Sequence, residues 1–129
     1  MSLQSHPMGV VKRLNVVYLY VRDLDRSIAF YRDVLGIPVE RDAHNPEWAE
    51  ARFPDGVRFA LHPWHEGVPE IGSGSVMIDF EVEDFEDAIA RLRKAGVEAS
   101  EPLREFWGSV CTFTDPDGYR IDLFQPPSS

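Results

Sequence analysis

Residues 113–124 read Phe-Thr-Asp-Pro-Asp-Gly-Tyr-Arg-Ile-Asp-Leu-Phe, a pattern typical of a β-hairpin. Proline presets the backbone for a turn, aspartate can bond its own backbone, and Gly118 supplies a position of positive φ. Residues of strand character alternate on both sides of the turn, as in strands with one buried face. Cys111 and Leu123 fall on one predicted face and Asp122 falls on the other, so the hairpin assigns these side chains to opposite sides of a sheet.

The chain carries a second, weaker copy of this hairpin, together with other repeated positions in the same order. Repeats of this length indicate duplicated supersecondary units, neither of which can bury its apolar face alone. The repeated positions are Pro54, Asp55, Gly56, Arg58 and Leu61, which lie 62 residues before Pro116, Asp117, Gly118, Arg120 and Leu123, and Val21-Arg22-Asp23-Leu24, which recurs as Val82-Glu83-Asp84-Phe85.

Each half of the chain predicts the element order β-α-β-β-β. The fold class is therefore α+β, with two tandem βαβββ modules at residues 10–66 and 72–126 of one domain, and residues 1–9 as a flexible leader. In the first module we expect a strand over 15–21, a helix capped by Asp23 or Asp25 and ended by Gly36, and strands at 38–41, 48–53 and 57–62. In the second we expect a strand over 76–82, a helix opened by Asp84 or Glu86 and ended by Gly96, a short strand at 97–99, a loop over 101–108 and the final hairpin.

Composition narrows the class of protein. The 129 residues are 43% hydrophobic and 27% charged, which is ordinary for a soluble globular domain. A formal net charge of −9 argues against nucleic acid or an anionic membrane as a partner. The single cysteine, Cys111, excludes an internal disulfide, and we expect a buried thiol there. Because the sequence shows no signal peptide and no apolar run that could span a membrane, we expect a cytoplasmic protein.

Two motifs carry a resemblance to a known family. Val-Arg-Asp-Leu-Asp-Arg-Ser-Ile-Ala-Phe-Tyr-Arg-Asp-Val-Leu-Gly at 21–36 and Asp-Pro-Asp-Gly-Tyr-Arg-Ile-Asp-Leu-Phe at 115–124 closely resemble the vicinal oxygen chelate superfamily. This group contains glyoxalases, bleomycin-resistance proteins and extradiol dioxygenases. The resemblance covers roughly residues 11–125 and is specific for the superfamily, but for no single activity within it. It implies curved sheets whose concave faces enclose a pocket, with the helices outside.

The resemblance also implies a divalent metal held at four positions, two in each module, where it acts as a Lewis acid. The repeat offset places these positions at Val16, Ala60, Met77 and Asp122. Valine and alanine offer no lone pair, and a thioether is a poor ligand for hard divalent ions. Since one carboxylate cannot hold a catalytic metal, we expect no metal and no other cofactor. A displaced site remains an alternative, in which His62 joins Asp122 and either Asp79 or Glu81.

Three classes of function stay open. The first is a homodimer that binds a small organic molecule in the pocket without a metal, as resistance proteins of the superfamily do. Aromatic rings beside carboxylates would favour flat cationic ligands in such a pocket. The second is an enzyme of lyase, isomerase or dioxygenase type, which uses a non-standard metal site or His62 with Asp122 or Asp79 as acid and base. The third is a structural or interaction module. The predicted ligand-binding residues are Tyr18, Trp48, Arg52, His62, Trp64, Asp79, Trp107 and Asp122, while Phe106 is a further aromatic candidate and His65 is expected to be a solvated loop residue.

Overall fold

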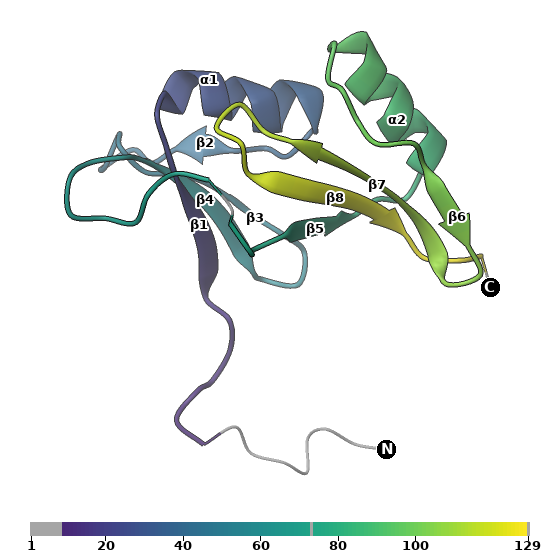
Figure 1. The fold of residues 1–129 in the computed structure, drawn as a ribbon. Helices are drawn as coiled ribbons and strands as arrows, with labels where there is room; N and C mark the ends of the chain where they lie inside the picture. Colours follow the sequence, from purple (N-terminus) through teal and green to yellow (C-terminus); the bar gives the residue numbers. More distant parts are fainter. Residues whose placement is uncertain (1–8, 73, 129) are drawn as a thin grey trace.

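The computed structural model describes residues 9–72 and 74–128 (Figure 1). The predicted leader therefore falls almost wholly outside the described residues. Each half of the chain forms a four-stranded mixed sheet and one helix, which confirms the α+β class and the two βαβββ modules. The first sheet has the order β1-β4-β3-β2, with β1 Val16–Val21, β2 Glu40–Arg41, β3 Ala49–Arg52 and β4 Arg58–Pro63. The second has the order β5-β8-β7-β6, with β5 Ile78–Glu81, β6 Leu103–Glu105, β7 Gly108–Thr114 and β8 Arg120–Gln125.

The helices begin at the capping residues that the repeat marks. α1 spans Leu24–Ala29 and α2 spans Phe85–Lys94. Asp23 accepts a hydrogen bond from the third backbone N–H beyond it, and Asp84 does the same for α2, each at 3.0 Å. α1 is shorter than expected because residues 30–34 continue as a π-helical turn.

The short strand expected at residues 97–99 and the continuous loop expected over residues 101–108 are both wrong, because the strand lies at Leu103–Glu105. The backbone N–H of Val97 is used to close the end of α2, where it donates to the carbonyl of Leu92 at 2.9 Å. The chain first reaches the edge of β7 at Ser100, whose backbone N–H donates to the carbonyl of Thr112 at 2.8 Å, and regular strand pairing begins only at Leu103, which lies opposite Val110. Local strand propensity was therefore overridden by the path between helix and sheet.

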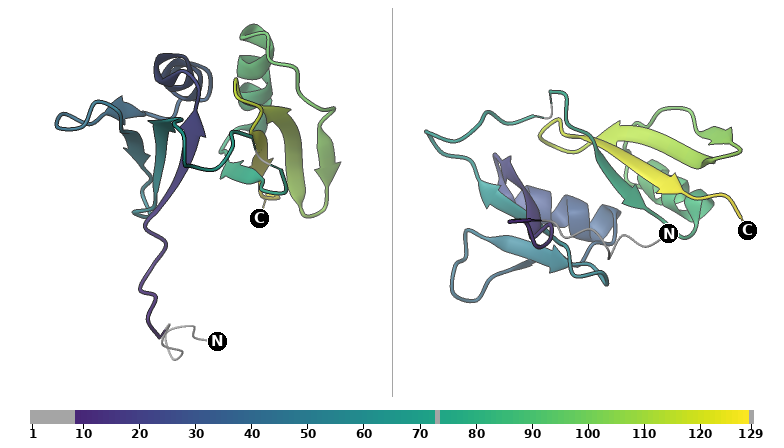
Figure 2. Two further views of the ribbon diagram at one scale, coloured as in Figure 1. Left: turned by 60° about the vertical axis from the view of Figure 1, so that its left-hand side comes forward. Right: turned by 90° about the horizontal axis from the view of Figure 1, so that it is seen from below.

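Both helices cover the same side of the molecule. Seen from below, the strands of both sheets lie in front and the two helices lie behind them (Figure 2). One continuous core fills the space between helices and sheets and includes Leu19, Phe59 and Ile121. Phe80 of the second module packs against Phe59 of the first, with ring centroids 5.4 Å apart. The modules thus share their core on the helix side, and the opposite face of each sheet is left open.

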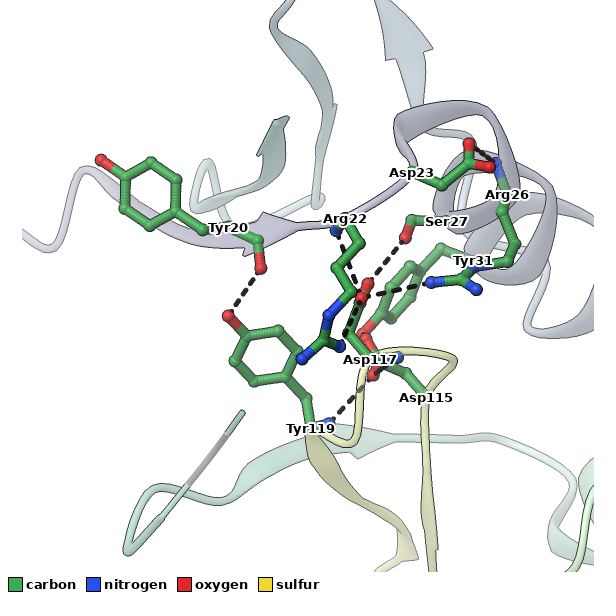
Figure 3. A network of polar contacts seen from close by, with 9 residues as sticks. All are labelled: Tyr20, Arg22, Asp23, Arg26, Ser27, Tyr31, Asp115, Asp117 and Tyr119. Carbon is green, nitrogen blue, oxygen red and sulfur yellow. Dashed lines mark hydrogen bonds and ion pairs between the residues drawn. The ribbon is translucent and has the colours of Figure 1, made fainter. Parts of the chain in front are cut away.

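A polar joint also ties the second hairpin turn to α1 (Figure 3). The buried carboxylate of Asp117 accepts hydrogen bonds from the backbone and guanidinium of Arg22, from Arg26 and from the hydroxyl of Ser27, at 3.2–3.3 Å. Tyr31 donates to the carboxylate of Asp115 at 2.6 Å. The other oxygen of Asp115 accepts two backbone N–H groups of its own turn, as the turn chemistry predicts. The turn therefore serves as a contact between modules as well as a hairpin connection.

Candidate functional site

The open face of each sheet is the candidate site, and strand register assigns its residues. On the first sheet, Tyr18 lies opposite Ala60 and Tyr20 lies opposite His62. Glu50 lies opposite Ala60 on the other side, so β1, β4 and β3 all contribute to this face. On the second sheet, Asp79 and Asp122 lie directly opposite one another. We call these two surfaces the first and second open faces.

Aromatic rings cover the first open face. Tyr18 contacts Trp48 with centroids 5.3 Å apart and Tyr20 with centroids 5.6 Å apart. His62 completes the circuit, with centroids 5.8 Å from Tyr20 and 6.4 Å from Trp48. Tilted and edge-to-face contacts at these distances are the favourable arrangements of aromatic pairs. The structure thus brings three of the predicted ligand-binding residues together, and we call Tyr18, Tyr20, Trp48 and His62 the ring group.

Hydrogen bonds hold two members of the ring group. The indole N–H of Trp48 donates to the carboxylate of Glu50 at 2.7 Å, and Arg58 donates to the same oxygen at 3.0 Å. The Nδ1 atom of His62 lies 2.8 Å from the carbonyl oxygen of Pro63. Because a carbonyl oxygen only accepts, Nδ1 carries the proton, and Nε2 of a neutral His62 keeps its lone pair. His62 can therefore accept a hydrogen bond or a proton at Nε2.

The second open face is acidic. Asp122 accepts a hydrogen bond from the hydroxyl of Thr112 at 2.7 Å. Partial burial raises the pKa of Asp79 above its usual range, and the neighbouring charges of Asp122 and Glu81 raise it further. Like-charged carboxylates across adjacent strands destabilise one another, and a bound cation would relieve this repulsion.

The remaining predicted ligand-binding residues lie farther along the two modules. Arg52 ends β3 and donates to the carbonyl of Gly56 at 3.1 Å, at the first hairpin turn. Trp64 follows β4 and donates to the carbonyl of Pro69 at 3.1 Å. Trp107 belongs to the turn between β6 and β7 and stacks on Phe124, with centroids 6.4 Å apart. None of the three takes part in the ring group, and their roles in binding stay predictions.

The side chains at the family's metal positions do not fit a divalent metal. Ala60 has no exposed area, and the larger side chains of Tyr18 and Glu50 flank it on both neighbouring strands. Val16 and Ala60 lack donor atoms, and Met77 offers only a thioether. Within residues 9–72 and 74–128, no cluster of three or more His, Cys, Asp or Glu side chains is suited to a metal ion. The chemistry of these four positions therefore departs from that of a metal centre.

Two hollows in the described part of the chain lie away from the predicted site. One, of about 170 Å³, lies beside α2 and includes Ile89, Leu92 and Cys111 among its lining residues. The other, of about 410 Å³, lies at the start of α2 beside Gln125. Neither is lined by the ring group or by Asp79 and Asp122. The open faces are surfaces of the chain rather than walls of these cavities.

Sequence reasoning missed two features of the site. His65 is exposed, as expected for a loop residue, yet its ring lies 5.9 Å from that of His62 and 6.0 Å from that of Tyr20. The burial of Asp117 against α1 was also missed, because its partners lie 90 or more residues away in the chain. The internal repeat contained one signal for the contact of Asp117. Arg22 of the first module corresponds to Glu83 of the second, so only the first module offers a cation at this position.

Comparison with known proteins assigns the class. The chain belongs to the Glyoxalase/Bleomycin resistance protein/Dioxygenase superfamily, whose family model matches residues 13–123. Lactoylglutathione lyase of Haemophilus influenzae is 31% identical over 122 residues, which cover 86% of this chain and 90% of that protein. The lactoylglutathione lyase of Salmonella typhimurium is 29% identical and covers 88% of this chain and 92% of its own.

Solved structures of the superfamily share the fold. TnmS3, an antibiotic binding protein from Streptomyces sp. CB03234, superimposes with a TM-score of 0.74 at 26% identity, over 91% of this chain and 98% of its own. A glyoxalase/dioxygenase from Nostoc punctiforme superimposes with a TM-score of 0.75 at 20% identity, over 95% and 96% of the two chains. In the described part of the chain, neither helix is long and apolar enough to cross a membrane.

Proposed function

We propose that this protein binds a small organic molecule between the open faces of its sheets, without the divalent metal of the superfamily. The observation that carries the proposal is the first open face. The ring group there lies beside Ala60, which has no exposed area, pairs with Tyr18 and occupies a position where the superfamily holds a metal. Mostly apolar, aromatic surfaces with a few placed polar groups are typical of small-molecule sites. The similarity to TnmS3, an antibiotic binding protein, supports the same class of function.

The proposed pocket forms between two copies of the chain. The open faces carry exposed large side chains that one copy does not cover, and Tyr18, Met77 and Leu103 are each more than two-fifths exposed. A homodimer that joins the first open face of one copy to the second open face of the other buries these side chains and encloses the ligand. Light scattering coupled to size-exclusion chromatography should give about twice the 14.7 kDa mass of one chain. A monomer at the concentration of the binding assay would contradict this arrangement.

Metal content and ligand binding test the function directly. Protein purified without tag or chelator should contain metal far below one equivalent, and nickel, zinc, manganese and ferrous ions should each leave the melting temperature unchanged. Ligand-detected NMR with a mixed panel of small organic compounds should then identify binders that Tyr18→Ala weakens. Near-stoichiometric metal together with a melting shift of several degrees would overturn the metal-free proposal.

A metal-free or displaced-metal enzyme is the second candidate. Its support is the resemblance to proteins named lactoylglutathione lyase, together with the acceptor nitrogen of His62 beside Tyr20. An assay for lactoylglutathione lyase activity, with and without added divalent metal, separates the two candidates. Activity that is lost in His62→Gln but kept in His44→Gln, at an exposed histidine of the loop between β2 and β3, would favour the enzyme.

A further inference from the structure

The ring group has the geometry of a stacking surface. Its four rings contact one another in a closed circuit, with centroids 5.3–6.4 Å apart. Tyr18 keeps 45% of its surface exposed, so its ring is available to another molecule. Each ring is held at an angle to its neighbours, and a flat molecule laid on one ring therefore meets the edges of the next. Aromatic pairs prefer this combination of offset stacking and edge contacts.

The support beneath the rings is rigid. Trp48 cannot rotate freely, because its N–H is bound to Glu50 and that carboxylate is held in turn by Arg58. Arg58 donates its other terminal nitrogen to the side chain of Asn15 at 3.1 Å. This chain of hydrogen bonds runs across β3, β4 and the residue before β1. It fixes Trp48, one of the four rings, before any ligand arrives, which lowers the entropy cost of binding.

Charge distinguishes the two open faces. Glu50, the carboxylate next to the rings, is already compensated by Arg58. On the second open face, Asp79 and Asp122 lie opposite one another, and Glu81 adds a third carboxylate on the same strand as Asp79. Arg120, two residues before Asp122 on β8, brings one positive charge to this face, and the three carboxylates outnumber it. The first face thus offers a group of four aromatic rings, and the second offers an excess of negative charge.

We propose that the ligand of this site is a flat aromatic cation, which stacks on the ring group while its charge is balanced by Asp79 and Asp122. The inference rests on the proposed function, because the dimer brings an aromatic face and an acidic face to the two sides of one pocket. Aromatic faces attract cations through the ring quadrupole, and a buried cation also needs a carboxylate partner. A neutral flat molecule can stack on the rings, but it does not relieve the repulsion between the carboxylates.

Proflavine, a planar tricyclic cation, and acridone, a neutral tricycle of similar shape, form a matched pair of probes. We expect proflavine to bind at least tenfold more tightly than acridone in a fluorescence titration at pH 7.4. Asp79→Asn should reduce this preference, and added salt should weaken proflavine alone. Trp48→Leu and Tyr18→Leu each remove a ring while keeping apolar surface, and each should weaken proflavine binding about threefold to tenfold. Val17→Ala is the control, because Val17 lies on the same strand but the opposite face.

The outcomes separate this inference from the proposed function. If acridone binds as tightly as proflavine, or if neither ring variant weakens proflavine while both still fold by circular dichroism, the inference is overturned. If proflavine fails to bind while uncharged members of the mixed panel do, the inference is also overturned and the proposed function stands. If no compound binds and the protein is a monomer, both are wrong.

Discussion

Replacement of Asp117 by alanine should reveal how much of the stability comes from the joint between the modules. The side chain of Asp117 has no exposed area, whereas those of its partners Arg22 and Arg26 are 61% and 48% exposed. Water can therefore replace the carboxylate as the hydrogen-bond acceptor of both guanidinium groups. The buried hydroxyl of Ser27 and the backbone N–H of Arg22 lose an acceptor that water reaches less easily, and an unsatisfied buried donor costs about 1–3 kcal/mol. We expect Asp117→Ala to lower the free energy of unfolding by about 2–4 kcal/mol.

The internal repeat supplies a matched control. Asp55 occupies the same place in the first hairpin turn, but it is exposed, and among the described residues it accepts only the backbone N–H of Val57 in its own turn, at 3.0 Å. Asp55→Ala should therefore cost below about 1 kcal/mol. Urea denaturation followed by circular dichroism measures both values, and the slope should stay constant if the unfolding remains a two-state process. Equal losses in the two variants would refute the idea that Asp117 joins the modules.

Three further predictions concern single side chains. Tyr31→Phe removes the only side-chain donor seen on the carboxylate of Asp115 among the described residues. It should lower the free energy of unfolding by about 1.5–3 kcal/mol in the same denaturation assay. A loss below about 0.5 kcal/mol, which is on the order of the error, would show that water replaces the tyrosine hydroxyl as donor. The raised pKa of Asp79 means that its protonated form favours folding, so stability falls as the pH rises from its usual pKa through the raised one. Asp79→Asn should thus gain stability relative to the parent between pH 3 and pH 7, by below about 1 kcal/mol because the group is exposed, and an equal difference at both pH values would contradict the assignment. Gly118→Val should cost roughly 1–3 kcal/mol, since Gly118 has a φ of 91° with open space around it and the cost is backbone strain alone; an unchanged melting temperature would mean that the turn relaxes freely.

Features that depend on neighbours in the chain could be predicted from the sequence. Alternation of side chains placed Asp122 and Cys111 on opposite faces of the hairpin, and the structure confirms this through the pairing of Cys111 with Leu123. Helix caps and the glycines that end the helices were predicted as well, because each acts within about one turn of helix. The strand expected at residues 97–99 was wrong because the position of that strand does not depend on its neighbours in the chain. Its place depends on where the edge of β7 lies, which no local pattern contains.

The same distinction between local and long-range information applies to the candidate site. The family resemblance and the repeat offset together predicted the four metal positions at Val16, Ala60, Met77 and Asp122, because side-chain chemistry at an aligned position needs no coordinates. Tertiary structure decided what surrounds those positions. The ring group joins β1, the residue before β3 and the end of β4, and the docking of Asp117 on α1 joins residues 90 or more positions apart. Such contacts follow from strand register and from the packing of the modules, and neither can be read directly from the sequence. The sequence thus determined the fold class and the residue types at the predicted metal positions, and the tertiary structure decided that four aromatic rings gather on the first open face and that Asp79 and Asp122 lie opposite one another on the second.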